Sequence, residues 1–250
     1  MLGTGYGDCK VKKAASKDYR HKGGVIIDSE ILIDAPEDVF ALADEFSITD
    51  LLDKITAVFF SHSHEGHFSL SAIEELKKHR TLNVFGSREL LSLIPDDIGI
   101  VKNEAIPFQT IEYSGYTVIP IPANHKTDNR EECCLNYVIS KDRTVLYMLD
   151  GGFINVAAWD VISQTKLDAV IMDTAAELEA PTAKLISHGS FETNRIIKDM
   201  LVNSGAANER TRFILSHIPS KRKRSVHEEL SALSLNHGFT VAYDGYFLNL

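Results

Sequence analysis

The sequence has little of what defines several common protein classes. It contains 3 cysteines, 7 prolines and 1 tryptophan in 250 residues. No hydrophobic run approaches about 20 residues, the length that a membrane-spanning helix needs. Three cysteines, two of them adjacent at Cys133 and Cys134, cannot form a disulfide framework, which is typical of a reducing compartment. No basic segment followed by an apolar one opens the chain, so we expect a cytoplasmic protein without membrane association.

Positive charge is also scarce. Lysine and arginine total 26 against 35 acidic residues, a net charge of −9, which argues against a broadly basic nucleic-acid binder. Hydrophobic residues make up 44% and charged residues 24%, so the chain as a whole is not disordered and can bury a core. Because no linker rich in proline, glycine or serine divides it, we expect residues 1–250 to form a single domain.

Short β-rich runs alternate with helical segments. Strands are predicted at 24–27, 31–34, 57–61, 83–85, 116–122, 135–139, 144–149, 169–173, 212–216 and 240–243. Ser71 and Ser225 each stand three residues before a glutamate, the spacing of a capping box that starts a helix. Apolar stripes predict three helix faces, at Leu70, Ile73 and Leu76, at Ile196, Ile197, Met200 and Leu201, and at Val226, Leu230 and Leu233. The order favours the α/β (α+β) class, with two mixed sheets packed face to face and helices outside.

Three histidines stand within six residues, directly after an apolar run, in the motif His62-Ser-His64-Glu-Gly-His67. A strand that enters a tight loop gathers such side chains at its carboxyl end, and neutral imidazole is the commonest ligand for Zn²⁺ and similar metals. The motif therefore indicates a metal site. An exposed histidine-rich turn is the alternative.

Further residues of the same chemistry follow later strands. They are His125, Asp150, His188 and His217. Each one alone is more typical of a structural histidine or a turn aspartate, but four of them after the histidine motif favour one shared site. Asp173, at the end of another predicted strand, is a candidate to support that site from behind.

The motif and the order of the later residues resemble the metallo-β-lactamase-fold hydrolases, whose signature is H-x-H-x-D-H followed by a distant His, Asp and His. Leu2-Gly-Thr-Gly5 and the run Leu32-Ile-Asp34-Ala before the motif also fit, so the resemblance covers nearly the whole chain. The chain is most similar to the phosphodiesterase branch, which includes cyclic phosphodiesterases associated with carbon–phosphorus lyase and tRNA 3′-processing nucleases. This resemblance implies a four-layer αβ/βα sandwich.

The resemblance also implies a ligand set. The first metal would be held by His62, His64 and His125, the second by His67 and His217, and both by a bridging Asp150. His188 falls where the phosphodiesterase branch places a histidine beside the site, and would donate a proton to the leaving group. The family's aspartate in H-x-H-x-D-H is Gly66 here, so the second metal loses an oxygen ligand, and the neighbouring Glu65 is not expected to replace it.

These assignments imply a metal-dependent hydrolase, a phosphodiesterase that uses a metal-activated hydroxide, with His188 and Asp150 as catalytic residues. We expect one tightly bound Zn²⁺ and a second that is weak or absent, with Mn²⁺ or Fe as alternatives. The expected substrate is a small phosphodiester or nucleotide-like molecule, with RNA a less favoured alternative, and the chain could form a homodimer. A weakly active protein that binds metal or nucleotide is one alternative function, and a thioester or lactone hydrolase on the same fold is another.

Other signals have simpler interpretations. The basic run Lys221-Arg-Lys-Arg224 fits a solvated loop better than a phosphate-steering patch. Gly3-Thr-Gly5-Tyr-Gly7 matches no phosphate-binding loop and indicates a turn. The remaining histidines, His21, His79, His227 and His237, are interpreted as surface or helix residues.

Overall fold

The protein is built around two large β-sheets, and the computed structural model describes residues 3–6, 17–176, 178, 187–219 and 226–250. The first sheet has five strands in the order β2-β3-β4-β5-β6. These strands are β2 (Val25–Ile27), β3 (Ile31–Ile33), β4 (Ala57–Phe59), β5 (Asn83–Gly86) and β6 (Val101–Glu104). Only the β2–β3 pair is antiparallel, so the sheet is mixed.

The second sheet has seven strands in the order β14-β12-β11-β10-β9-β8-β7. They are β7 (Ile111–Tyr113), β8 (Tyr116–Pro122), β9 (Leu135–Ser140), β10 (Thr144–Met148), β11 (Ala169–Asp173), β12 (Arg212–Ser216) and β14 (Phe239–Val241). Its first part is a parallel group from β10 to β14, and its second part is an antiparallel meander from β7 to β10. A short parallel pair, β1 (Gly5–Tyr6) with β13 (Ile218–Pro219), lies outside both sheets.

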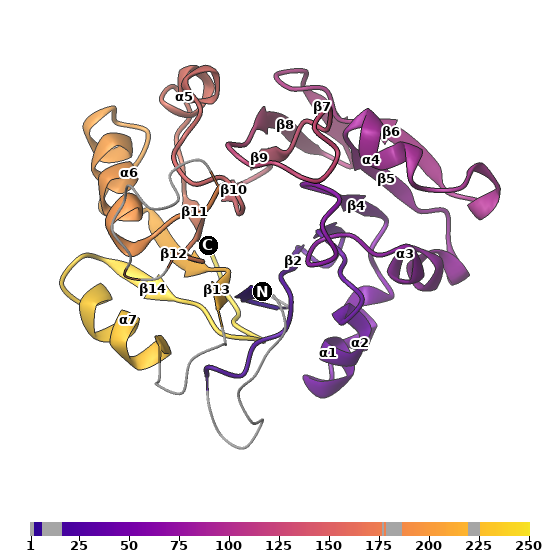
Figure 1. Cartoon of the computed structure of the whole chain (residues 1–250), viewed down its shortest axis with the longest axis horizontal. Coiled ribbons are helices and arrows are strands. Elements are labelled where there is room, and N and C mark those ends of the chain that lie inside the picture. Colours follow the sequence, from indigo (N-terminus) through magenta and orange to yellow (C-terminus); the bar gives the residue numbers. More distant parts are fainter. Residues whose placement is uncertain (1–2, 7–16, 177, 179–186, 220–225) are drawn as a thin grey trace.

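Helices cover the outer face of each sheet, as Figure 1 shows on the two flanks of the molecule. The first sheet is covered by α1 (Val39–Glu45), α2 (Thr49–Leu52), α3 (Leu70–Leu76) and α4 (Arg88–Ser92). The second is covered by α5 (Val156–Ile162), α6 (Phe191–Asn203) and α7 (Val226–Ser234). Two short 3₁₀ turns, η1 (Lys77–His79) and η2 (Asp96–Ile98), complete the helical elements of the described residues.

The strands are apolar on both faces because both faces are buried. Ile31 and Ile33 of β3 pack between the two sheets, whereas Leu32 packs under the helices of the first flank. In the second sheet, Tyr147 of β10 points between the sheets and Leu146 points toward α5–α7. Burial of alternate residues on opposite sides yields continuous hydrophobic runs, the pattern expected for sheets covered on both faces. The four layers are thus helices, sheet, sheet and helices, which confirms the predicted fold class.

All ten predicted strands are present, with bounds that differ by at most two residues at either end. The strands that the sequence did not reveal are β1, β6, β7 and β13. Of these, β6 reads Val-Lys-Asn-Glu at a sheet edge, and the others have only two or three residues. The strands β6 and β7 carry no hydrophobic period because their residues are partly or fully exposed, and β1 and β13 are too short to show one.

Two details of the helix predictions are wrong. The N-cap of α3 is Ser69, which has an extended backbone and whose hydroxyl oxygen accepts the Ala72 amide, while Ser71 lies inside the first turn. Ile196 and Leu233 are 44% and 39% exposed, because each lies at the edge of an otherwise buried helix stripe. Ser225 lies outside the described residues, as do Lys221–Arg224 and Gly7. Within the part of the chain that the structure describes, no helix combines the length and apolar character needed to cross a bilayer.

Candidate metal centre

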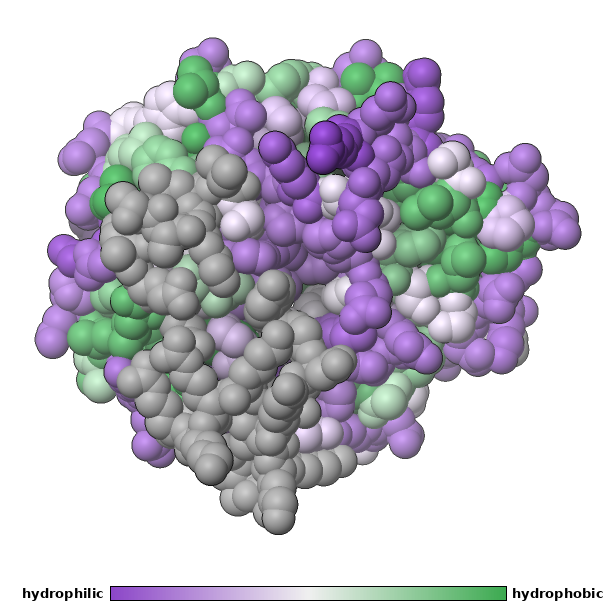
Figure 2. Space-filling view, viewed as in Figure 1, coloured by the Kyte–Doolittle hydropathy of each residue, from purple (hydrophilic) through white to green (hydrophobic). Residues whose placement is uncertain are grey.

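The predicted site residues meet at one edge of the two sheets. Asp34 follows β3, His62 follows β4, Asp150 follows β10 and His217 follows β12. Parallel strands bring their carboxyl ends to the same edge, where ligands of open α/β sheets are bound. His125 reaches this edge from the end of β8, which runs in the same direction as β10 because both are antiparallel to β9. In Figure 2, hydrophilic residues form a band across the middle of the face that is seen, between the two helical flanks.

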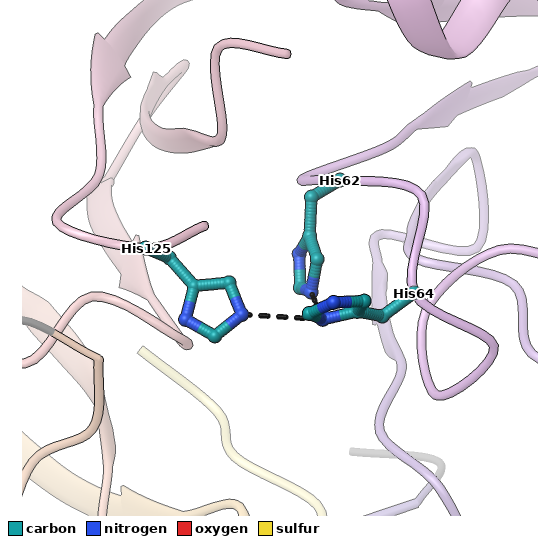
Figure 3. A group of neighbouring side chains, drawn as sticks. All are labelled: His62, His64 and His125. Carbon is teal, nitrogen blue, oxygen red and sulfur yellow. Dashed lines mark hydrogen bonds between the residues drawn. The ribbon is translucent and has the colours of Figure 1, made fainter. Parts of the chain in front are cut away.

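His62, His64 and His125 form the first of two side-chain groups at this edge, which we call the three-histidine group. His62 and His64 come from one loop and point toward His125, which comes from the opposite wall (Figure 3). The Nδ1 atom of His64 lies 3.0 Å from Nε2 of His62 and 3.2 Å from Nε2 of His125. Three ring nitrogens therefore face one small volume.

These distances fit a metal ion. Bonds of about 2.0–2.1 Å from a tetrahedral Zn²⁺ place ligand nitrogens about 3.3 Å apart. The other ring nitrogen of His62, Nδ1, lies 3.0 Å from the Ser61 hydroxyl, and that of His125 lies 3.0 Å from the Ser187 carbonyl oxygen. Metal-bound histidines usually have such a partner on the second nitrogen, because it fixes the ring and its tautomer.

The second group, which we call the Asp150 group, surrounds one buried carboxylate. Asp150 is 3% exposed, and its Oδ2 lies 2.5 Å from Nε2 of His67 and 3.8 Å from Nε2 of His62. Its Oδ1 lies 3.1 Å from Nε2 of His217 and 2.9 Å from Nδ1 of His188. Asp150 thus lies between the residues of both groups, where a carboxylate could bridge two ions.

A second buried carboxylate, Asp34, supports His67 from behind. Its Oδ2 lies 2.8 Å from Nδ1 of His67 and accepts hydrogen bonds from the hydroxyls of Tyr147 (2.6 Å) and Ser61 (2.9 Å). Its Oδ1 accepts the Ser61 amide at 2.8 Å. The sequence resemblance drew attention to Asp34 as a family feature, but the supporting roles of Tyr147 and Ser61 carry no signal in the sequence.

His188 is held by two carboxylates. Its Nδ1 lies 3.0 Å from Oδ2 of Asp173, in addition to the contact with Asp150. Asp173 also accepts the Gly189 and Ala175 amides, at 3.0 and 2.7 Å, so its orientation is set by the backbone. Asp173 is expected from the sequence to support the site from behind, and the structure shows that the residue it contacts is His188.

Gly66 leaves open space where the family has a carboxylate. A Cβ atom built on Gly66 would meet no atom of the described residues within 4 Å. Gly66 is also not among the described residues with a positive φ, so it does not adopt a conformation that only glycine tolerates. The Glu65 side chain is 87% exposed and pairs with Lys22, as expected of a residue that does not replace the missing aspartate.

The two groups differ in the pKa values of their imidazoles. Burial lowers the pKa of His62 well below its ordinary value and lowers that of His125, which favours neutral, metal-binding rings. For His67, burial lowers the pKa, but Asp150 and Asp34 together raise it to about 10. For His188, burial has the same effect, and the hydrogen bonds to Asp150 and Asp173 raise the pKa to about 10. Burial raises the pKa of Asp150, but the neighbouring His217 and His67 hold it well below its ordinary value.

Three residues of this edge have a backbone that is rare for residues other than glycine. The φ angles of Asp34, Asp150 and His217 are 58°, 50° and 56°. Asp34 and His217 come directly after the last residue of a strand, and Asp150 comes one residue later. Strain of this kind costs on the order of 1–3 kcal/mol per residue and is concentrated at functional sites.

The fold and the two ligand groups together define an α/β sandwich with a histidine-rich site for divalent metal at the strand ends. Residues 29–218 match the model of the beta-lactamase superfamily domain. The chain therefore belongs to that family, which is a family of hydrolases. A comparison with curated protein sequences finds no significant match.

Solved structures share the fold at low sequence identity. The metallo-beta-lactamase fold protein YhfI from Bacillus subtilis is 16% identical with a TM-score of 0.73, over 98% of this chain and 95% of that one. A diphosphatase from the PhnP family is 20% identical with a TM-score of 0.73, over 100% and 96%. The short form of human tRNase Z is 14% identical with a TM-score of 0.64, over 99% and 97%. The family match confirms the resemblance that the histidine motif predicted, and these solved structures share the fold.

Proposed function

We propose that this protein is a metal-dependent phosphodiesterase. The observation that carries the proposal is the convergence of six histidines and Asp150 at the edge where both sheets end. A divalent ion at such a site supplies a Lewis acid and lowers the pKa of bound water, with Zn²⁺ to about 7. We assign zinc as the metal, with Mn²⁺ or Fe as alternatives.

The residues of the chain then have separate tasks. His62, His64 and His125 would bind the first ion, and His67, His217 and the shared Asp150 would bind the second. His188 would carry the proton for the leaving oxygen on Nε2, because Nδ1 faces Asp150 and Asp173. Together these groups would neutralise the charge that develops on a phosphoryl group and on its leaving oxygen.

A phosphodiester is the substrate class that we favour. The PhnP-family diphosphatase and tRNase Z, which share the fold, are named for reactions on phosphate compounds. The substrate we propose is small and nucleotide-like, since the chain carries a net charge of −9 and has no overall attraction for a long polyanion. Gly66 favours a second candidate, a weakly active protein that binds metal or nucleotide, since an oxygen ligand of the second ion is absent.

A substrate panel tests the proposal. Purified protein loaded with Zn²⁺ or Mn²⁺ is assayed with a chromogenic phosphodiester, a cyclic nucleotide, a thioester and a lactone. We expect hydrolysis of the phosphate substrates, lost in His64→Ala and retained in His237→Ala, which changes a histidine outside the centre. Faster thioester or lactone hydrolysis would replace the proposed substrate class, and metal binding without any turnover would favour the second candidate.

A further inference from the structure

Another buried carboxylate, that of Glu132, lies beside the three-histidine group and forms no hydrogen bond to its rings. Glu132 is 8% exposed. Its Oε1 accepts the Ser63 amide at 2.8 Å, and its Oε2 accepts the Ser63 hydroxyl at 2.5 Å and the Thr127 hydroxyl at 2.7 Å. One carboxylate thus receives three hydrogen bonds from two segments of the chain.

The two segments are the ones that carry the three histidines. Ser63 stands between His62 and His64, and Thr127 follows two residues after His125. The contacts from Glu132 therefore link the loop after β4 to the segment after β8, which form opposite walls of the group in Figure 3.

The hydrogen bonds to Glu132 make the connection between the two segments rigid. Hydrogen bonds to a charged carboxylate are roughly twice as strong as neutral ones and hold their geometry more closely. Ser63 is held at both its amide and its hydroxyl, which fixes the backbone as well as the side chain. The Thr127 hydroxyl also lies 3.0 Å from the Asn129 carbonyl oxygen, which can share its single proton with the closer Glu132 carboxylate at 2.7 Å.

A metal site depends on such bracing. Three nitrogens bind one ion well only when they are held within about 0.5 Å of the required positions. His64 and His125 come from different segments, and their 3.2 Å separation is set by how those segments lie relative to each other.

We propose that Glu132 is a positioning residue for the first metal, which sets the spacing of His64 and His125 by tying their two segments together. The proposal rests on the metal-binding function proposed above. Glu132 itself binds neither metal nor substrate.

Metal titration of three variants tests this proposal. Glu132→Ala removes the acceptor. Glu132→Gln keeps one oxygen for the Ser63 amide and offers an NH₂ group to the two hydroxyls, which can turn and accept. Asp168→Ala is the matched control, because Asp168 also accepts a backbone amide, that of Thr144 at 2.8 Å, but lies at the opposite end of β11. Affinity is measured with Zn²⁺ against a chromophoric chelator, and geometry from the visible spectrum with Co²⁺.

We expect Glu132→Ala to weaken the first metal by about 10- to 100-fold, the range for groups that orient metal ligands, and to alter the Co²⁺ spectrum. Glu132→Gln should recover most of the affinity. Asp168→Ala should lower the unfolding temperature of the metal-free protein without changing metal affinity. Unchanged affinity and spectrum in Glu132→Ala would overturn the proposal, as would a loss of affinity in Asp168→Ala that matches it at equal stability. An unmodified protein that binds no metal would instead refute the proposed function.

Discussion

The three-histidine group and the Asp150 group differ in the types of side chain that form them. The first consists of imidazoles only, two of them on one loop, and their nitrogens face each other at 3.0 and 3.2 Å. The second is arranged around a carboxylate, and its residues come from separate strand ends and segments. The first group thus offers three uncharged donors, whereas the second offers the carboxylate of Asp150 and is backed by those of Asp34 and Asp173.

This difference has a consequence for metal binding. A doubly charged ion bound at the three-histidine group has a compact donor set already in place. The second ion has His67, His217 and a shared carboxylate, since Gly66 provides no oxygen. We therefore expect the two groups to bind ions with unequal affinity, and the predictions below test this inequality from the largest expected effect to the smallest.

Asp150→Asn should have the largest effect. The amide carries no charge, and its NH₂ end would face a histidine nitrogen, so the second ion should be lost and the first weakened. We expect kcat/KM for a phosphodiester to fall by about 10³-fold, the upper end of the range for loss of one preorganised group. Metal content by atomic spectroscopy and steady-state kinetics provide the measurements. Two tightly bound ions in this variant would show that Asp150 does not bridge the groups.

His188→Ala should separate proton donation from metal binding. We expect unchanged metal content and a loss of about 10²-fold on substrates with poor leaving groups, with a smaller loss on good ones, since only poor leaving groups need a proton. Rates are compared across phosphodiesters whose leaving groups differ in pKa. Equal losses for all of them would count against the donor role, and loss of metal would place His188 among the ligands.

The sequence predicted the architecture well because its signals are local. Every predicted strand formed, since apolar runs such as Val145–Met148 are buried on both faces. The metal motif was visible because three of its histidines are neighbours in the chain. The hydrogen bonds around Asp34 and Glu132 were not predictable, because they join residues up to 113 positions apart and depend on side-chain orientation.

The same limit applies outside the centre. His227, interpreted from the sequence as a surface or helix residue, is a helix residue in the first turn of α7 and is only 8% exposed. Its Nδ1 lies 3.0 Å from Nη2 of Arg20, a residue that is itself 1% exposed. Burial of this pair results from contacts between the two ends of the chain, which no local pattern reveals.

Gly66→Asp should reduce the inequality between the two groups. The new carboxylate restores an oxygen, and we expect the second Zn²⁺ to bind about tenfold tighter or more. Because the built Cβ meets no described atom and φ is not positive, the unfolding temperature of the metal-free protein should not fall. Gly66→Ala is the control that adds the Cβ without the oxygen. Two tightly bound ions in the unmodified protein would mean that another residue replaces the aspartate.

The smallest effect concerns His227, a buried imidazole that lies outside the metal centre. Burial and then the charge of Arg20 lower its pKa to about 4, so the folded protein keeps it neutral and its Nδ1 accepts from Arg20. The unfolded chain binds a proton at a pKa of about 6.5, so protonation favours unfolding. Stability from this group is complete above pH 6.5 and is lost as the pH falls toward 4.

His227→Asn keeps an acceptor near the position of Nδ1 but cannot titrate in this range. The free energy of unfolding of each metal-free protein is measured in urea. As the pH falls from 6.5 to 4, this free energy should decrease more for the unmodified protein than for the variant. A difference that does not change with pH would show that His227 is already protonated beside Arg20, or that solvent reaches it.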